Sequence, residues 1–164
     1  IEVQHPFRGA VEARRRVGNL AATNHATVPA DLGMSHNMAT DENAGSRLLQ
    51  LGAIERLLTV ALETGITEIR EVRPLPDDVI PIDAEEGLAV ARYPVLLSLR
   101  ASQAQLERLF ARTAEAPCLL TLNRLKVEWN SVAQSGAFDV VLVFTLLGPP
   151  PEPVADAPEG EEST

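Results

Sequence analysis

Residues 138–146 carry apolar side chains on both alternating sets of positions, and this pattern constrains the fold more than any other feature of the chain. Such a run is typical of a central strand that is buried on both faces. An isolated hairpin does not provide that environment. The chain must therefore build a sheet of several strands with other elements packed against it.

Two amphipathic helices are predicted, one ahead of each pair of strands. From residue 44 onward, leucine and isoleucine recur every three or four positions, and Gly65 stands where a left-handed cap would end that helix. Ser102 and Gln105 have the spacing of a capping box, which predicts the start of a second helix. This helix should end before Pro117, because proline disfavours a helical conformation in the preceding residue.

Four strands are predicted around these helices, over residues 66–72, 93–99, 118–129 and 138–146. In the third strand the spacing of apolar residues changes near Asn123, which indicates a β-bulge. Prolines and acidic residues fill the stretch from Pro74 through Gly87, so we expect a long loop there. The order helix, strand, strand occurs twice. It predicts an α+β fold, a ferredoxin-like two-layer sandwich of two α-β-β units in which a four-stranded antiparallel sheet carries two helices on one face.

Three segments are expected along the chain. Residues 1–43 should form a short N-terminal helix and a long connector, residues 44–147 the (αββ)2 domain, and residues 148–164 a disordered tail rich in proline and acid. The net charge is −9, and five of the acidic residues lie in the tail. An acidic chain of this kind is a poor candidate for binding nucleic acid.

Neither a catalytic motif nor a metal-binding motif is found in the sequence. The histidines are scattered, Cys118 has no cysteine or histidine close to it, and the Met34–Met38 segment, whose two thioethers and imidazole could accept Cu(I), is better explained by packing. Cys118 is expected to be a small buried side chain. The carboxylate pairs at 77–78 and 85–86 are expected in solvated turns. We therefore predict no catalytic residue, no metal and no cofactor, and a protein that is not an enzyme.

Several segments together resemble a known family. They are the helix end "LETGITEI", the run "YPVLLSLRASQAQLERLFARTAEAP" and the paired strands "CLLTLNRLKVEWN" and "AFDVVLVFTLL". In this order they resemble the periplasmic domain of PilO-like proteins and their GspM-like relatives. The resemblance implies two α-β-β units, and a place in the inner-membrane platform of a type IV pilus or type II secretion machine. It also implies a membrane helix and a coiled coil ahead of the domain. No membrane helix or clear heptad pattern is visible here, so the anchor is expected upstream of Ile1.

The resemblance further implies pairing, as a homodimer or with a PilN-like αββ partner. The residues lead to the same expectation independently, because an open sheet has two edges that invite another chain. If the strand through residue 95 is an edge, the predicted interface residues are Tyr93, Val95 and Leu97. If the open sheet face is used, they are Leu125, Val127 and Trp129. Any of the six could instead be an ordinary core position.

A small-ligand regulatory domain of the ACT type is the alternative, since it is also ferredoxin-like and binds ligands at dimer interfaces. That class of domain has a glycine-bearing turn after its first strand. The corresponding junction here, Arg73 to Pro76, contains two prolines and no glycine.

Overall fold

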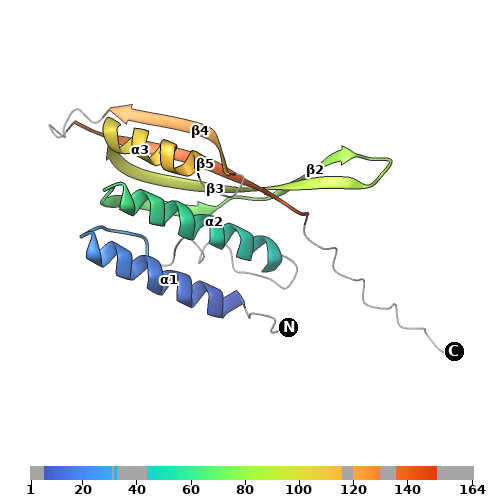
Figure 1. The fold of residues 1–164 in the computed structure, drawn as a ribbon, viewed down its shortest axis with the longest axis horizontal. Helices are drawn as coiled ribbons and strands as arrows, with labels where there is room; N and C mark the ends of the chain where they lie inside the picture. The colour runs from blue at the N-terminus through green and yellow to red at the C-terminus, as the bar shows by residue number, and fades with distance from the viewer. Residues whose placement is uncertain (1–5, 31, 33–43, 116–119, 130–135, 151–164) are drawn as a thin grey trace.

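The computed structural model describes residues 6–30, 32, 44–115, 120–129 and 136–150. They form an α+β structure in which helices pack on an antiparallel sheet (Figure 1). The helices are α1 (Pro6–Thr23), α2 (Ala44–Glu63) and α3 (Gln103–Ala114), and the strands are β1 (Glu68–Pro74), β2 (Asp78–Asp83), β3 (Leu88–Ser102), β4 (Leu120–Trp129) and β5 (Ala137–Gly148).

The sheet is organised around the long strand β3. The strands are ordered β1-β3-β5-β4, and β2 also pairs with β3. β5 runs along one side of β3, while β1 and β2 follow each other along the other side, β2 opposite Leu88–Arg92 and β1 opposite Val95–Arg100. The sheet therefore has five strands, whereas the sequence predicted four. Its description as ferredoxin-like stays an interpretation.

The extra strand, β2, lies inside the stretch that was expected to be a loop. Pro81 is tolerated because, in the part of the chain that the structure describes, β2 pairs with β3 alone, so the missing N–H need not remove a bond to a second strand. Gly87 supplies a φ of +69° in the turn to β3, a conformation that strains residues with a side chain. Asp78 and Arg92 form an ion pair across the two strands. The result is a hairpin arm that extends beyond the helices (Figure 1).

Helices α2 and α3 cover one face of the sheet. Alternate side chains of β3 point into this layer and are at most 1% exposed: Ala91, Tyr93, Val95, Leu97, Leu99 and Ala101. From α2, Ile54, Leu58 and Leu62 meet them and are completely buried. The apolar stripe predicted from residue 44 onward is therefore the main contact between helix and sheet.

Helix α1 lies beside α2 (Figure 1) and buries Ala13, Val17 and Ala21 against it. It is 18 residues long, whereas a short helix was expected. Pro6 is its first residue, a position where proline removes no helical hydrogen bond. Arg16 forms an ion pair with Glu55 of α2.

The signals predicted for the start of α3 and for the end of α2 are confirmed. Ser102 accepts a hydrogen bond from the backbone N–H of Gln105 at 3.2 Å, and the Gln105 side chain accepts one from the Ser102 N–H at 2.9 Å. Gly65 follows α2 with a φ of +88°. The register of β4 against β5 shifts between Leu122 and Arg124, so the bulge expected near Asn123 is present.

Tyr93 ties the end of β5 to the core. Its ring is completely buried, and its hydroxyl donates a hydrogen bond to the Pro149 carbonyl. A Cβ on Gly148 would approach Cε2 of this ring to 3.2 Å, so glycine allows the close contact. Burial, and to a smaller extent the charge of Asp77, raise the pKa of Tyr93 above its ordinary value of 10.0.

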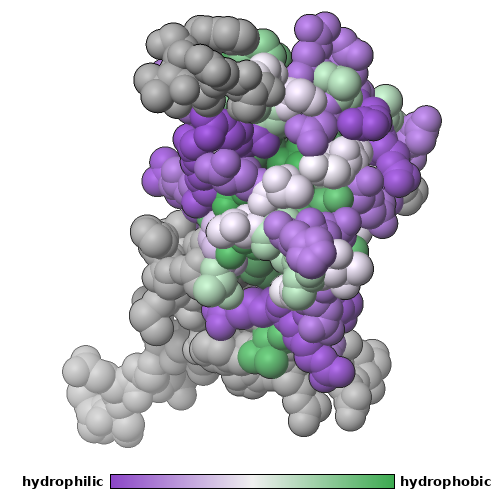
Figure 2. Space-filling model, turned by 90° about the vertical axis from the view of Figure 1, so that its left-hand side faces the viewer, coloured by the Kyte–Doolittle hydropathy of each residue, from purple (hydrophilic) through white to green (hydrophobic). Residues whose placement is uncertain are grey.

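The surface at the end of the molecule seen in Figure 2 is mixed. Hydrophobic residues there are divided by hydrophilic ones.

Each helix in the described part of the chain falls short of the length or the hydropathy of a membrane span.

Replacing Ser102 with alanine should lower the free energy of unfolding by about 1 kcal/mol, because it removes the hydroxyl that accepts the hydrogen bond from the Gln105 N–H, although the Ser102 N–H can still donate to the Gln105 side chain. Urea denaturation measures the loss. Gln103→Ala is the matched control at the next residue, whose exposed side chain donates a hydrogen bond to Glu107, and it should change stability by less than about 0.5 kcal/mol. Equal losses of stability in the two variants would show that the Ser102 hydroxyl does not stabilise the start of α3.

Tyr93 is the single tyrosine, so the absorbance of tyrosinate reports on it alone. In the folded chain it should ionise above pH 10.0, its ordinary pKa. The unfolded state ionises first as the pH rises, so the stability due to neutral Tyr93 is complete below pH 10.0 and is lost as the pH approaches the folded-state pKa. Tyr93→Phe should remove this part of the pH dependence of stability. Ionisation of Tyr93 at its ordinary pKa of 10.0 in the folded chain would contradict the raised pKa.

Candidate interaction surface

Strand β4 forms one edge of the sheet. Among the described residues it pairs with β5 alone, and residues 121–128 are all exposed. A strand in this position presents a row of backbone N–H and C=O groups that a further strand can pair with. The opposite edge differs, because the backbone of Thr27 bonds Thr67 and Ile69 there at 2.8 and 3.0 Å, in a parallel bridge opposite Glu68.

A row of apolar side chains runs along β4. Leu122, Leu125 and Val127 are 37%, 47% and 46% exposed. They stand opposite Phe144, Leu142 and Val140 of β5, which are core residues. Residues directly opposite in an antiparallel pair share a face, so this row lies on the helix side of the sheet. We call Leu122, Leu125 and Val127 the β4 row.

The position of the β4 row corrects the sequence-based expectation. Leu125 and Val127 were assigned to the open sheet face, but their β5 partners Leu142 and Val140 point toward the helices. The row is exposed because α3 reaches only the start of β4, where Phe110 and Thr113 line a cavity of about 130 Å³ with Leu120, Leu122 and Phe144. Trp129 stands opposite Phe138 in the register, and its side chain lies outside the described residues.

The other predicted interface residues, Tyr93, Val95 and Leu97, are not on an edge. They belong to β3, which has strands on both sides, and each is 0% exposed. Strict alternation is shared by edge and central strands, so the pattern alone could not distinguish them. In this chain they form the core under α2, and another protein has no access to them.

The open face of the sheet is charged rather than continuously apolar. Arg70 Nη1 lies 2.9 Å from Asp139 Oδ1, and Arg100 lies 3.7 Å from the same carboxylate and 3.8 Å from Glu68. Four residues along β3 and β5 from this charged cluster, the half-buried Leu96 and Val143 stand opposite each other.

The hairpin arm is a second exposed apolar region, which the sequence reasoning missed. Val79, Ile82 and Leu88 are 49%, 69% and 52% exposed. The cluster of β-branched residues at 79–82 was the available signal, because such residues favour strands, but the neighbouring prolines were given more weight.

The aspartates of the carboxylate pair at 77–78 and of the arm make ion pairs or hydrogen bonds with neighbouring residues of the fold. Asp78 pairs with Arg92, whose hydrogen bonds lower the pKa of the Asp78 carboxyl. Asp77 Oδ2 accepts a hydrogen bond from Ser46 at 3.3 Å. Asp83 accepts bonds from the N–H groups of Glu85 and Glu86, which stabilises the turn of the arm.

No metal cluster of three or more His, Cys, Asp or Glu side chains occurs in the ranges that the structure describes. Cys118 and the Met34–Met38 segment lie outside those ranges.

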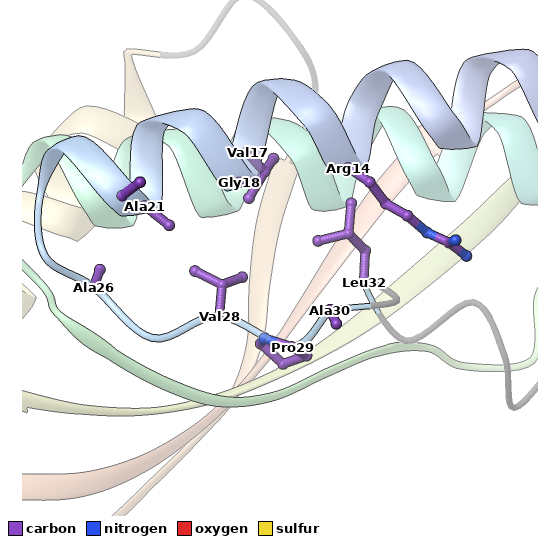
Figure 3. A pocket seen from close by; sticks show the side chains of 10 residues that line it. Arg14, Val17, Gly18, Ala21, Ala26, Val28, Pro29, Ala30 and Leu32 are labelled. Carbon is purple, nitrogen blue, oxygen red and sulfur yellow. The ribbon is translucent and has the colours of Figure 1, made fainter.

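A cavity of about 270 Å³ lies between α1 and the chain after it (Figure 3). Val17 and Ala21 of α1 line it together with Val28 and Leu32, and Arg14 is at its margin. Its lining consists of small apolar side chains and one cation. This set offers a place for packing and lacks a nucleophile or an acid–base pair.

The chain was compared with known proteins. It matches no protein-family model, and no curated protein matches its sequence. The core domain of a protein from Akkermansia muciniphila superposes with a TM-score of 0.69 at 15% identity, covering 88% of each chain. A protein from the same organism without its transmembrane region gives 0.67 at 16% identity, covering 84% of this chain and 80% of that one. The type 4 fimbrial biogenesis protein PilO from Pseudomonas aeruginosa gives 0.49 at 13% identity, covering 82% and 96%.

The Akkermansia structures share the fold of this chain. The first match covers 88% of the chain, a share that residues 44–164 cannot supply alone. The shared fold therefore includes part of residues 1–43, in agreement with the packing of α1 on α2.

Two leucines test the placement of the β4 row. Leu97→Ala should lower the free energy of unfolding by about 2–5 kcal/mol, because it leaves a cavity in the core, whereas Leu125→Ala should lower it by less than about 1 kcal/mol. Urea denaturation followed by tryptophan fluorescence, at the lowest concentration the signal allows, measures both. Equal losses would show that Leu125 is covered within a single chain.

Proposed function

We propose that this chain is a non-enzymatic scaffold domain of a pilus-assembly complex. It holds other proteins of the complex in place by direct contact. One observation carries the proposal, the exposed sheet edge at β4 with the β4 row beside it. Backbone groups along an edge give affinity to an added strand, and adjacent apolar side chains give specificity.

The assignment to pilus assembly is supported by the sequence resemblance to PilO-like proteins. The run "YPVLLSLRASQAQLERLFARTAEAP" forms most of β3, the capping box and α3, and the paired strands of the resemblance are β4 and β5. The elements that carry the resemblance are thus the ones that build the exposed edge. The resemblance also extends to GspM-like proteins of type II secretion, and the same scaffold would serve in that machine.

We place the domain in the periplasm, attached to the inner membrane by a segment outside this sequence. The sequence resemblance supports this location. One of the Akkermansia proteins that share the fold has a transmembrane region that was left out of its structure, so this fold occurs in a protein with a membrane-spanning part.

The partner is a second copy of the chain or a PilN-like protein of similar αββ fold. Either one presents strand edges of its own. The ACT-type alternative gains no support, because that class of domain has a glycine-bearing turn after its first strand, and the junction between β1 and β2 contains no glycine.

Leu125→Asp should disrupt the complex without unfolding the domain. An aspartate at this exposed position is solvated in the free chain and would be desolvated in an interface. The change is made in the full-length protein in its host. The measurements are co-purification of pilus-assembly proteins after cross-linking and the number of surface pili.

Ile82→Asp on the hairpin arm is the matched control, because Ile82 is also apolar and is 69% exposed. It should leave the complex intact. The melting temperature of each purified domain excludes unfolding as the cause. Unchanged co-purification and normal piliation with Leu125→Asp would overturn the proposed function.

A further inference from the structure

We propose that the cavity between α1 and the chain after it binds a free carboxylate that carries an alkyl chain of medium length, such as octanoate. The alkyl chain lies among the apolar side chains of the lining, and Arg14 pairs with the carboxylate at one end. This inference goes beyond the proposed function. The cavity adjoins the segment that Thr27 joins to the β1 edge, whereas the β4 row lies at the opposite edge of the sheet.

The wall of the cavity that faces α1 is held in place by backbone hydrogen bonds. The Thr27 N–H donates to the Thr67 carbonyl at 2.8 Å, and the Thr27 carbonyl accepts from the Ile69 N–H at 3.0 Å. The Ala26 N–H donates to the Ala21 carbonyl at 2.8 Å and ties the wall to the end of α1. These bonds keep the segment from closing onto α1. The cavity is therefore formed before a ligand arrives, as is usual for small-molecule sites.

Backbone strain accompanies this wall. His25 and Leu32 each have a φ of +52°, and they are the non-glycine residues with positive φ in the ranges that the structure describes. They precede and follow the wall residues Val28 and Pro29. This conformation is unfavourable for leucine, and strained residues of this kind cluster at ligand sites. The side chains of Val28 and Leu32 both point toward α1 (Figure 3), so the strained segment presents apolar groups to the cavity.

The lining and the volume select an apolar group. The side of the cavity formed by α1 carries small residues, among them Val17, Gly18 and Ala21. A Cβ on Gly18 would meet no heavy atom within 4 Å outside its own helix, so there is free space beside the backbone. An apolar cavity of about 150 Å³ holds a benzene molecule. The 270 Å³ of this cavity admits a larger apolar group, and its burial removes apolar surface of both ligand and protein from water.

Arg14 supplies the charge that selects an anion. Its side chain is exposed and lies beside Leu32 at one end of the cavity (Figure 3). In the described part of the chain no carboxylate pairs with it, because Glu12 and Glu55 both pair with Arg16 instead. The planar guanidinium of an arginine matches the geometry of a carboxylate and can donate two parallel hydrogen bonds to it.

Other small ligands fit this site less well. None of the described lining residues is acidic, so a cation gains no partner and meets Arg14 as a like charge. A neutral alcohol fills the apolar part of the cavity but offers no charge to the guanidinium. A short carboxylate such as acetate has no alkyl chain to bury. The combination of an alkyl chain and a carboxylate satisfies both parts of the site.

Alanine methyl groups test the location of the site. Ala22, Ala26 and Ala30 line the cavity, whereas Ala91 and Ala101 are buried on β3. Octanoate is added to the 164-residue chain with isotope-labelled alanine methyl groups. The first three signals should shift in methyl NMR spectra, with a Kd of about 1 mM or tighter, and the signals from β3 should stay in place. Acetate at the same concentrations should shift none of the five.

A charge variant tests the selection of an anion. Arg14→Gln should weaken the binding of octanoate about fivefold, because the ion pair is lost. It should leave the binding of 1-octanol unchanged, and the wild type should bind this alcohol more weakly than octanoate. Arg15→Gln is the matched control, since Arg15 is the next residue, is also exposed and does not line the cavity. It should bind both ligands like the wild type.

A filled cavity provides a test that does not depend on charge. Gly18→Leu places an apolar side chain in the free space and should weaken octanoate binding about tenfold or more. Gly52→Leu on α2 is the matched control, because Gly52 is exposed and a Cβ there also meets nothing within 4 Å. It should bind octanoate normally. Both variants should melt at or above the temperature of the wild type, since leucine favours a helix more than glycine does.

Four results would overturn the inference. They are unchanged signals of Ala22, Ala26 and Ala30 with octanoate, normal affinity of Arg14→Gln, normal affinity of Gly18→Leu, and 1-octanol that binds as tightly as octanoate. A fifth concerns the source of the ligand: tighter binding of dihexanoylphosphatidylglycerol than of octanoate would assign the cavity to a membrane lipid instead of a free carboxylate. The β4 row takes no part in any of these measurements, so the proposed function is tested separately by Leu125→Asp.

Discussion

The pairing of β3 with three other strands is the interaction on which the rest of the structure depends. One side of β3 pairs with β5 over almost its whole length, and the other side pairs with β2 and then β1. Every second residue from Ala91 to Ala101 points into the helix layer and is buried. Since the register of a strand fixes the face of each side chain, a shift of one residue in β3 would move this whole set to the open face.

The exposed edge at β4 follows from how the helices are placed on this sheet. Helix α2 packs against β1 and β3, and α3 contacts β3 and forms, with Leu120, Leu122 and Phe144, the cavity at the start of β4. A buried polar residue of α2 fastens this helix to the β1 side of the sheet. Gln50 is fully buried and donates hydrogen bonds to the carbonyls of Leu75 and Pro94, at 2.7 and 3.1 Å. The molecule is thus closed at the β1 side by helices and the Thr27 segment, and open at β4.

Local signals in the sequence were sufficient for the elements whose ends depend on one or two residues. The capping box at Ser102, the end of α2 before Gly65 and the bulge after Leu122 are all of this kind. β2 was missed because Pro81 excludes a strand with two partners but permits one with a single partner, and the number of partners is a tertiary property. The same limit applies to the predicted interface. Tyr93 and Leu125 follow similar alternating patterns, and only the order of strands and the placement of α3 make the first a core residue and the second an exposed one.

The parallel bridge between Thr27 and β1 determines how a mechanical load would enter the sheet. Two backbone hydrogen bonds, from Thr27 to Thr67 and from Ile69 to Thr27, join the segment after α1 to the edge of the sheet in a parallel bridge. Tension applied at the N-terminal end of α1 and resisted at the sheet would load these two bonds and the contact of α1 with α2 before it reached the interior strands. The two bonds flank one residue pair, Thr27 and Glu68, so such a load falls on both of them. The attachment of α1 to the sheet is thus concentrated at one point of the β1 edge, whereas the strands of the sheet are joined along their length.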